Sequence, residues 1–309
     1  MKAVRIHGYG GADQLRVDEV AVPEPGADEV LVRVEAAGVN PVDWKIRADL
    51  TGGMLPIDFP ATLGTEVAGT VSKVGPGVAD YSPGDEVFAH QGFLGGYAEY
   101  VVAPVASLAR KPDNIDFARA SSVPMPGLTA WKAMVEIAGI GAGQTVLIHG
   151  AAGGVGSIAV QIAKARGARV IGTASAANEA RLRELGVDEF VDYRKQPFED
   201  VVQDVDMVFD LIGGDTEARS LKVLKPGGLL VTAAMPPNVE AATAANVRAA
   251  FVAVGPNGAA LAELGKLIED GRVRIAEPQM FTMDKAADAH ALSETGHSAR
   301  RIVLATKGA

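Results

Sequence analysis

The stretch that decides the fold is HGAAGGVGSIAVQIAKARG, residues 149–167. It follows the apolar run Thr145–His149, which has the length and β-branched content of a buried strand. It leads into Val155–Arg166, whose apolar periodicity predicts a helix. A glycine-rich turn between a strand and a helix is typical of doubly wound parallel sheets. The simplest alternative is a turn that only packs a strand against a helix.

Three glycines of this turn, Gly153, Gly154 and Gly156, let the backbone bend tightly and approach a ligand. The N–H groups at the start of a helix have no partner within it, and the helix dipole there favours negative charge. The turn therefore predicts a site for the pyrophosphate of a dinucleotide. Ala151 stands where the usual fingerprint has its first glycine, so the strand and helix around the turn carry the inference.

The alternation of strand and helix patterns continues from about Ala118 to about Pro256. Apolar runs predict further strands at Arg169–Thr173, Asp206–Leu211, Leu229–Thr232 and Phe251–Val254. Periodic runs predict helices at Glu179–Leu185, Thr216–Leu224 and, in the tail, Ala259–Asp270, before a strand-like end at Ile302–Ala305. This order is typical of a parallel sheet with crossover helices.

Residues 1 to about 117 have a different sequence pattern. Turn signals rich in glycine and proline recur at short intervals, with short β-branched runs between them. The runs are Val30–Val34, Val67–Val74, Glu86–Ala89 and Tyr97–Val102. Because such runs favour strands, this part is predicted to be an all-β domain.

The composition is that of a globular protein without cysteine. Of the 309 residues 48% are hydrophobic and 22% charged, and the net charge is −9. A negative field repels nucleic acid and anionic membrane surfaces, so neither is an expected partner. The absence of cysteine excludes disulfides and cysteine-containing zinc sites and favours a cytoplasmic location. No apolar run reaches the roughly 18 residues of a membrane span, and we expect no signal peptide.

The end of the second strand of the parallel sheet indicates which dinucleotide is bound. An acid there would bond the ribose 2′-hydroxyl of NAD, but the strand runs into Ser175 without a carboxylate. Donors for a 2′-phosphate are available at Ser175, Asn178, Arg181, Tyr193 and Arg194. NADP is therefore favoured over NAD. Ser175 and Asn178 are also good helix caps, and the two roles are compatible.

Several collinear motifs extend over nearly the whole chain. They are GTEVAGTVSKVGPGV at 64–78, GDEV at 84–87, GGYAEYV at 95–101, PMPGLTAW at 124–131, HGAAGGVG at 149–156 and GHSARRIVL at 296–304. With them the sequence resembles the zinc-independent quinone oxidoreductase and zeta-crystallin branch of the medium-chain dehydrogenase/reductases.

The resemblance implies an α/β protein in three parts. These are a GroES-like β-rich substrate domain at 1–117, a doubly wound (Rossmann) NADP-binding domain at 118–256, and a C-terminal segment at 257–309 that returns to the first domain. It also suggests a homodimer made by edge pairing of the doubly wound sheets. Phe251–Val254, as the final strand, would supply that edge.

The zinc-dependent relatives hold their metal with cysteine and histidine, and the resemblance places Asn40, Thr65 and Met125 at those positions. Amide, hydroxyl and thioether groups are a poor ligand set for zinc. The five histidines have no clustered ligand spacing; they are His7, His90, His149, His290 and His297. We therefore expect no metal site.

Without a metal, the resemblance implies that NADPH delivers hydride to a small conjugated acceptor, namely a quinone, an enone or an enal. By motif match the cofactor contacts include Asn40, Thr129, Gly153, Gly154, Val155 and Arg301. The candidate catalytic residues are Asn40 and Lys45 of the motif NPVDWKIR, residues 40–47. The Lys45 ammonium would bind a developing enolate oxygen. The alternatives are a solvated loop lysine at Lys45 and a solvated basic pair at Arg300 and Arg301.

Two other functions stay open. An enoyl-thioester reductase shares the fold and the hydride chemistry, and basic residues around its substrate mouth would favour it. A cofactor-binding protein without efficient turnover would bind NADPH tightly, and none of the acceptors tested would be reduced by it. The loops that would line a substrate carry no transferable code, so the sequence does not name the substrate.

Overall fold

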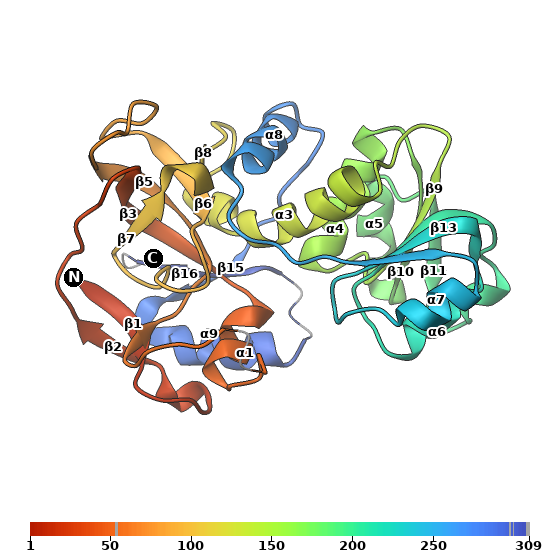
Figure 1. Ribbon diagram of the computed structural model, residues 1–309, viewed down its shortest axis with the longest axis horizontal. Helices are drawn as coiled ribbons and strands as arrows, with labels where there is room; N and C mark the ends of the chain where they lie inside the picture. The colour runs from red at the N-terminus through yellow and green to blue at the C-terminus, as the bar shows by residue number, and fades with distance from the viewer. Residues whose placement is uncertain (53–54, 297, 299, 307–309) are drawn as a thin grey trace. The chain divides into compact units, whose positions relative to one another are not determined.

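The computed structural model describes residues 1–52, 55–296, 298, 300–306 of the chain. It contains two compact units (Figure 1). Unit 1 comprises residues 1–125, 255–269 and 275–309, and unit 2 comprises residues 126–254 and 270–274. The sequence-based division had placed its boundaries after residues 117 and 256.

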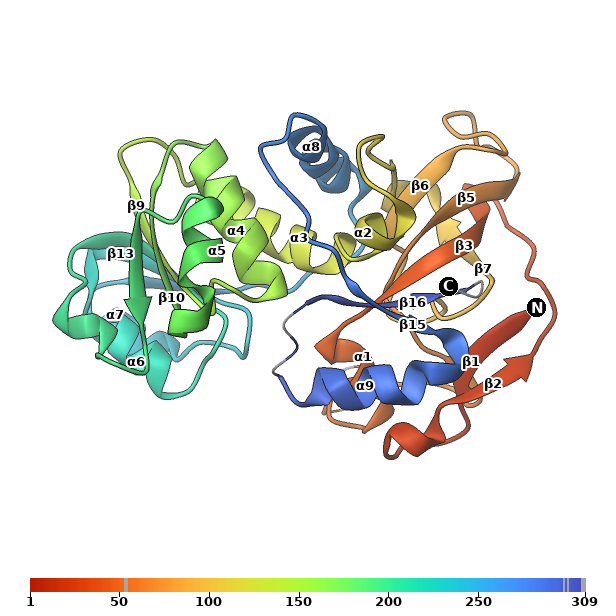
Figure 2. The ribbon, with the colours of Figure 1, turned by 180° about the vertical axis from the view of Figure 1, so that it is seen from behind.

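Unit 2 is built on a six-stranded parallel sheet in the order β11-β10-β9-β12-β13-β14. Its strands are β9 Thr145–His149, β10 Arg169–Ala174, β11 Glu189–Asp192, β12 Val205–Asp210, β13 Leu224–Thr232 and β14 Arg248–Phe251. Its helices are α4 Gly154–Ala165, α5 Glu179–Glu184, α6 Asp215–Ser220 and α7 Val239–Ala244. Helix α3 Pro124–Trp131 begins in unit 1 and continues into unit 2, where a π-helical turn, Lys132–Ile137, follows it. Helices α4 and α5 cover one face of the sheet, and α6 and α7 cover the other (Figures 1 and 2).

The strand order reverses beside β9. From β9 the chain winds outward through β10 to β11, then crosses back to β12 on the other side of β9 and winds outward again. Open α/β sheets bind ligands at the carboxyl ends of their strands where the order reverses. That point lies at the carboxyl ends of β9 and β12.

The predicted bounds of the last strand were wrong. The edge strand is Arg248–Phe251, not Phe251–Val254, because it pairs residue by residue with Leu229–Thr232 of β13. Val252 donates one more hydrogen bond, to the Thr232 carbonyl at 2.8 Å, just beyond the last paired residue of β14. The predicted helix Thr216–Leu224 is also too long, since α6 ends at Ser220 and Leu224 already opens β13.

Unit 1 is rich in β-structure. A three-stranded sheet has the order β2-β1-β4, and a seven-stranded sheet has the order β15-β16-β3-β5-β6-β8 with β7 also paired to β3. The strands are β1 Lys2–Ile6, β2 Arg16–Glu19, β3 Glu29–Val39, β4 Ala61–Thr62, β5 Glu66–Val74, β6 Glu86–His90, β7 Tyr100–Pro104, β8 Leu108–Arg110, β15 Gln279–Thr282 and β16 Ile302–Ala305. The helices are α1 Pro41–Arg47, α2 Phe117–Ser121, α8 Gly258–Glu269 and α9 Ala286–Glu294. The α/β class, with a β-rich unit and a parallel-sheet unit, is confirmed.

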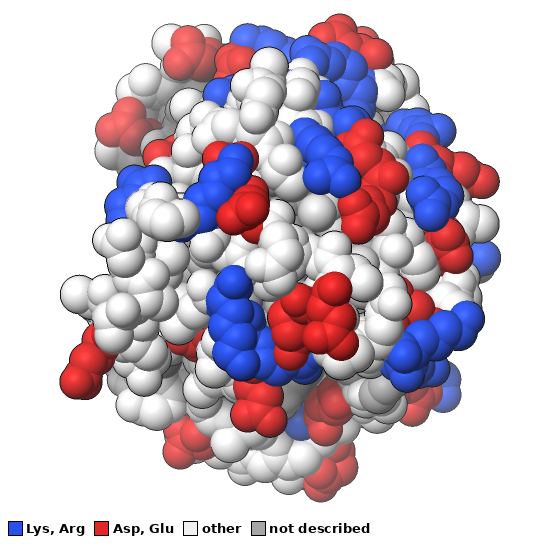
Figure 3. Space-filling model, turned by 90° about the vertical axis from the view of Figure 1, so that its right-hand side faces the viewer, with Lys and Arg blue, Asp and Glu red and all other residues white. Residues whose placement is uncertain are grey.

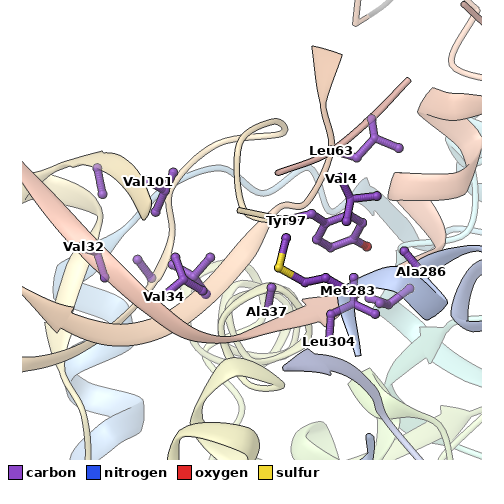
Figure 4. Close-up of a cluster of buried hydrophobic side chains, with 14 of the residues drawn as sticks. Val4, Val32, Val34, Ala37, Leu63, Tyr97, Val101, Met283, Ala286 and Leu304 are labelled. Carbon is purple, nitrogen blue, oxygen red and sulfur yellow. The ribbon is translucent and has the colours of Figure 1, made fainter. Parts of the chain in front are cut away.

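The core of unit 1 joins the two ends of the chain. Val4 from the first strand packs in the same buried cluster as Met283, Ala286 and Leu304 from the last fifty residues of the sequence (Figure 4). Leu304 is fully buried, and burying a leucine contributes about 1.5–3 kcal/mol. Residues 255–269 and 275–309 therefore belong to the β-rich unit, whereas residues 270–274 belong to unit 2.

The surface carries charges of both signs. Figure 3 shows one face on which basic and acidic side chains are interspersed. Ion pairs of the described surface include Lys225–Asp206 at 3.0 Å and Lys164–Asp188 at 2.8 Å. In the described parts of the chain, no helix combines the length and apolar character needed to cross a membrane.

Candidate active site

The glycine turn of unit 2 is shaped by close backbone contacts. The Gly153 N–H donates to the Gly150 carbonyl at 3.0 Å, and α4 begins at Gly154. A Cβ at Gly156 would lie 2.3 Å from the Gly150 carbonyl oxygen and 2.7 Å from the Ala151 Cα. Glycine is required there because helix and turn touch. The first N–H groups of α4 thus stand at the carboxyl end of β9, where a pyrophosphate would accept them.

Donors gather at the carboxyl ends of the neighbouring strands. Ala174 of β10 lies opposite Asp192 of β11, so Ser175 and Tyr193 leave the sheet side by side. The Asn178 Nδ2 donates to the Ser175 Oγ at 3.1 Å. Among the described residues, neither the Ser175 nor the Asn178 side chain makes a capping hydrogen bond to the helix that follows. These polar groups therefore do not have the capping role that the sequence also allowed.

Tyr193 and Arg194 form an exposed pair at the same edge. Tyr193 is 56% exposed, and the Arg194 guanidinium lies 5.6 Å from its ring centroid. The Arg194 Nε also donates to the Tyr193 hydroxyl at 3.3 Å. An aromatic face with a cation over it and hydroxyl groups nearby suits a phosphorylated ribose.

Asp210, which the sequence did not single out, holds the loop after β12. Its Oδ1 accepts the N–H groups of Ile212 at 2.8 Å and Gly213 at 3.0 Å. Its Oδ2 is buried and has no hydrogen-bond partner in the part of the chain that the structure describes. Burial raises the pKa of this carboxyl. The loop lies against the phosphate turn, since a Cβ at Gly150 would lie 3.2 Å from the Ile212 Cδ1.

A second cluster of polar residues is buried in unit 1. The register of the sheet builds it: β3 places Gly38 opposite Glu66, and it places Val39 opposite Ile302 of β16. Asn40 and Arg301, the residues next to Val39 and Ile302, therefore meet beside Glu66. A Cβ at Gly38 would lie 2.1 Å from the Glu66 Oε1, so a glycine leaves room for this carboxylate.

The hydrogen bonds of this cluster converge on Glu66. Its Oε1 accepts from the Arg301 Nη2 at 2.7 Å and the Asn40 Nδ2 at 2.8 Å, and its Oε2 accepts from the Met125 N–H at 2.7 Å. The Arg301 Nη2 also donates to the Asn40 Oδ1 at 2.8 Å. Burial raises the pKa of the Glu66 carboxyl, and the Arg301 charge works against that rise. The sequence hinted at Glu66 only as an acid inside the apolar run GTEVAG.

Comparison with known proteins settles the family. Residues 26–113 match the model of the alcohol dehydrogenase GroES-like domain, and residues 185–304 match that of the zinc-binding dehydrogenases. The 2-methylene-furan-3-one reductase of Solanum lycopersicum is 36% identical over 98% of this chain and 79% of its own length. The chain belongs to the medium-chain dehydrogenase/reductase family. Its quinone oxidoreductase branch, inferred from the motifs, is confirmed.

Other members of this branch agree in sequence and in structure. The chloroplastic NADPH-dependent alkenal/one oxidoreductase of Arabidopsis thaliana is 38% identical over 98% of this chain and 79% of its own. The Coxiella burnetii quinone oxidoreductase superposes with a TM-score of 0.89 at 34% identity, covering 99% of both chains. The Escherichia coli quinone oxidoreductase, solved with NADPH, has a TM-score of 0.88 at 30% identity and covers 99% and 100% of the two chains.

Asn40 and Thr65, which the resemblance places at zinc positions, do not fit a zinc ion. The Asn40 Nδ2 donates to the Thr65 Oγ1 at 3.1 Å as well as to Glu66, so an amide N–H group stands where a ligand lone pair is needed. The Arg301 guanidinium adds a positive charge beside them. In the described ranges no three histidine, cysteine or acidic side chains group as metal ligands.

Further candidate residues are Lys45, Thr129 and the histidines. Lys45 is exposed on α1, with its Nζ 5.8 Å from the Trp44 ring centroid. Thr129 is buried in α3 and belongs to unit 2. Of the described histidines, His7 meets Asp18 at 2.8 Å, while the other three, His90, His149 and His290, are buried with pKa values lowered mainly by burial. His297 lies outside the described residues.

Proposed function

We propose that this dehydrogenase is an NADPH-dependent reductase that transfers hydride to a quinone or an α,β-unsaturated carbonyl compound without a metal. One observation carries the proposal: Asn40 and Thr65, which the resemblance places at zinc positions, are hydrogen-bonded within a cluster that also contains Glu66 and Arg301. Conjugated acceptors suit such a site because their own π system spreads the charge that hydride transfer leaves on oxygen. The names of the reductases compared above support the same substrate class.

The glycine turn would hold NADPH. Gly153, Gly154 and Val155 are proposed to follow the pyrophosphate at the start of α4, where backbone N–H groups and the helix dipole favour anions. Thr129 is proposed to contact the nicotinamide ribose. When bound, the cofactor supplies the hydride.

Recognition of the 2′-phosphate is assigned to the strand ends beside this turn. The proposed donors are Ser175, Asn178, Tyr193 and Arg194. The end of β10 itself carries no carboxylate, and the Asp192 carboxylate at the end of β11 accepts the Arg194 N–H at 3.1 Å. The NADPH named for the Arabidopsis thaliana enzyme supports this preference.

In unit 1, Asn40 is proposed to accept a hydrogen bond from the nicotinamide ribose. Both hydrogens of its Nδ2 are already donated, to Thr65 and Glu66, and its Oδ1 accepts from Arg301. One lone pair of the Oδ1 stays available for a hydroxyl donor. Arg301 is proposed to donate to a cofactor phosphate. Its Nε is buried without a hydrogen-bond partner among the described residues.

Lys45 is proposed as the cation that stabilises the enolate or phenolate oxygen. Its ammonium is exposed, on the same helix that begins after Asn40. The contact would strengthen as negative charge develops, so it would act on the transition state rather than on substrate binding. The proton then comes from water or from a side chain.

We also propose a homodimer formed through β14 and a cytoplasmic location. β14 is the last strand of its sheet, and Phe251 on it is 40% exposed, so a two-fold mate could extend the sheet. The location rests on the absence of cysteine.

A screen of acceptors tests the function. Purified protein is mixed with NADPH or NADH and with quinones, enones, enals and enoyl thioesters, before and after dialysis against a chelator. The proposal expects turnover with a quinone or an enone, a preference for NADPH and no effect of the chelator. Turnover of enoyl thioesters alone would assign the runner-up reductase, and tight NADPH binding without any turnover would assign a cofactor-binding protein.

A further inference from the structure

A chain of buried polar side chains runs through unit 1 beyond the Glu66 cluster. The Tyr97 hydroxyl lies 3.0 Å from the Asp43 Oδ2, and the His290 Nε2 lies 3.3 Å from the same hydroxyl. The His290 Nδ1 lies 3.2 Å from the Arg47 Nη1, and the Arg47 Nη2 reaches Glu294 at 2.5 Å. These side chains come from α1, α9 and the segment before β7. Asp43, Tyr97, Arg47 and His290 are each at most 1% exposed.

The chemistry of the groups fixes the direction of each hydrogen bond. A guanidinium has no acceptor, so the His290 Nδ1 must accept from Arg47 and its Nε2 must carry the proton. The Nε2–H therefore donates to the Tyr97 oxygen, and the Tyr97 O–H donates to the Asp43 carboxylate. A neutral His290 agrees with its pKa, which burial first and the Arg47 charge second lower to about 3.

The series of hydrogen bonds from Arg47 through His290, Tyr97 and Asp43 ends at Asn40. The Asn40 backbone N–H donates to the Asp43 Oδ2 at 2.7 Å, the same oxygen that accepts from Tyr97. The other oxygen of this carboxylate, Oδ1, is buried and unpaired within the described residues. The position of the Asn40 backbone therefore depends on a carboxylate that is itself held by one hydroxyl.

The ring of Tyr97 has a separate, structural role. It packs among Val4, Met283 and Ala286 in the core of unit 1 (Figure 4). The hydroxyl therefore differs from the ring in what it does, and a Phe replacement separates the two.

We infer that Tyr97 and His290 are positioning residues, which hold Asp43 as the acceptor for the Asn40 N–H and so fix the Asn40 side chain for its work at the proposed active site. The inference rests on the proposed function for the role of Asn40. On this inference, the hydrogen bonds that link Arg47, His290 and Tyr97 position Asn40 in addition to packing α1 against α9.

The protonation of Asp43 gives this chain a measurable signature. Burial raises the pKa of Asp43 to about 7, while the Asn40 N–H and the Tyr97 hydroxyl lower it. The charged groups around it are Glu66, which raises this pKa, and Arg301, which lowers it. An ionised Asp43 accepts the Asn40 N–H most strongly, so activity should be present above this pKa and fall as the pH drops through it.

Removing the Tyr97 hydroxyl should move this pH dependence upward. Two to three hydrogen bonds lower a carboxylate pKa by about two units, so losing one raises it by about half a unit to one unit. A change that only loosens the fold would lower stability without moving the acid limb of the pH–rate profile.

The test compares Tyr97→Phe with Tyr81→Phe. Tyr81 also donates one hydroxyl hydrogen bond inside unit 1, to the Leu108 carbonyl at 3.1 Å, but it has no part in the chain. In Tyr97→Phe we expect a loss of about tenfold in kcat and an acid limb displaced to higher pH. NADPH affinity should also fall, because Asn40 is proposed to contact the nicotinamide ribose. Tyr81→Phe should match the parent in all three properties.

Hydrogen exchange of the Asn40 backbone amide supplies a readout that does not need turnover. Its exchange in the protein without cofactor should be faster in Tyr97→Phe, and also in His290→Leu, than in the parent. His290→Gln, which keeps a donor for Tyr97, should fall between His290→Leu and the parent.

The outcomes separate this inference from the proposed function. An unchanged pH profile and unchanged Asn40 exchange in Tyr97→Phe would overturn the inference, whatever the activity. If Asn40 exchange is faster in Tyr97→Phe but the parent reduces no acceptor, the hydrogen bonds of Tyr97 and His290 still position Asn40. That result would overturn the proposed function and not this inference.

Discussion

Replacing Gly156 by alanine tests whether the glycine turn is built for close packing. The new Cβ would lie 2.3 Å from the Gly150 carbonyl oxygen, whereas ordinary van der Waals contact begins at 3.4 Å. Turn and helix α4 would have to separate by the difference, about 1.1 Å. Both partners are backbone, so no side chain can rotate away. Overpacking of this kind costs about 1–3 kcal/mol.

Thermal unfolding with and without NADPH measures this effect. At roughly 2–4 °C per kcal/mol, Gly156→Ala should lower Tm by about 2–12 °C. NADPH at 100 times its Kd stabilises the parent by about 2.7 kcal/mol, a rise in Tm of roughly 5–11 °C. That rise should be smaller in Gly156→Ala because the displaced turn no longer presents its N–H groups to the pyrophosphate.

Gly153→Ala is the matched control. A Cβ there would lie 3.3 Å from the Gly150 carbonyl oxygen, just inside the 3.4 Å at which ordinary contact begins, so the Tm should fall much less than in Gly156→Ala. If Gly153 lies along the pyrophosphate, the methyl group will still reduce the rise in Tm that NADPH causes. Were Gly156→Ala to unfold at the parent temperature and keep the full NADPH shift, the packing argument and the site assignment would both be refuted.

Four further substitutions test separate parts of the account. Ser175→Asp should weaken NADPH selectively, through repulsion of the 2′-phosphate, in a fluorescence titration against NADH; equal weakening of both would count against the assignment. Lys45→Met should lower kcat by one to two orders of magnitude, about 1.4–2.8 kcal/mol, whereas rates within about twofold of the parent would make Lys45 a solvated lysine. Phe251→Lys should shift light scattering from dimer to monomer, and a persistent dimer would place the interface elsewhere. Burial lowers the pKa of His149 from its ordinary 6.5 to about 3 in the folded protein. Below pH 6.5 the unfolded protein therefore binds a proton that the folded protein does not, and the free energy of unfolding of the parent decreases as the pH falls. The difference in free energy of unfolding between the parent and His149→Gln, measured in urea, should therefore decrease by about 2 kcal/mol when the pH is lowered from 8 to 5. A difference that does not change with pH would disprove the buried neutral histidine.

The parallel sheet could be predicted because its signals are local. The strand Thr145–His149 is confirmed at both ends, and the helix after it begins one residue before the predicted start. An apolar run of strand length followed by a glycine turn leaves few other structures open. Phe251–Val254 failed because its strand is set by pairing with β13, which apolar content does not reveal.

The site in unit 1 could be predicted only in part. Asn40 and Arg301 were candidates from separate motifs, and the sheet brings them together at 2.8 Å although 261 positions separate them. Their shared partner Glu66 and the Tyr97–His290 chain depend on strand register and on the docking of α9. Such contacts join distant segments, and no spacing in the sequence encodes them.

The most direct test of the central claim is the oxidation of NADPH by metal-free protein with a quinone and an enone as acceptors. The absorbance of the reduced nicotinamide is followed with protein that has been dialysed against a chelator and checked by elemental analysis. The account predicts acceptor-dependent oxidation at an unchanged rate after dialysis, with no increase when zinc is added. Activity that disappears with the chelator and returns with zinc, or no oxidation with any acceptor, would contradict it.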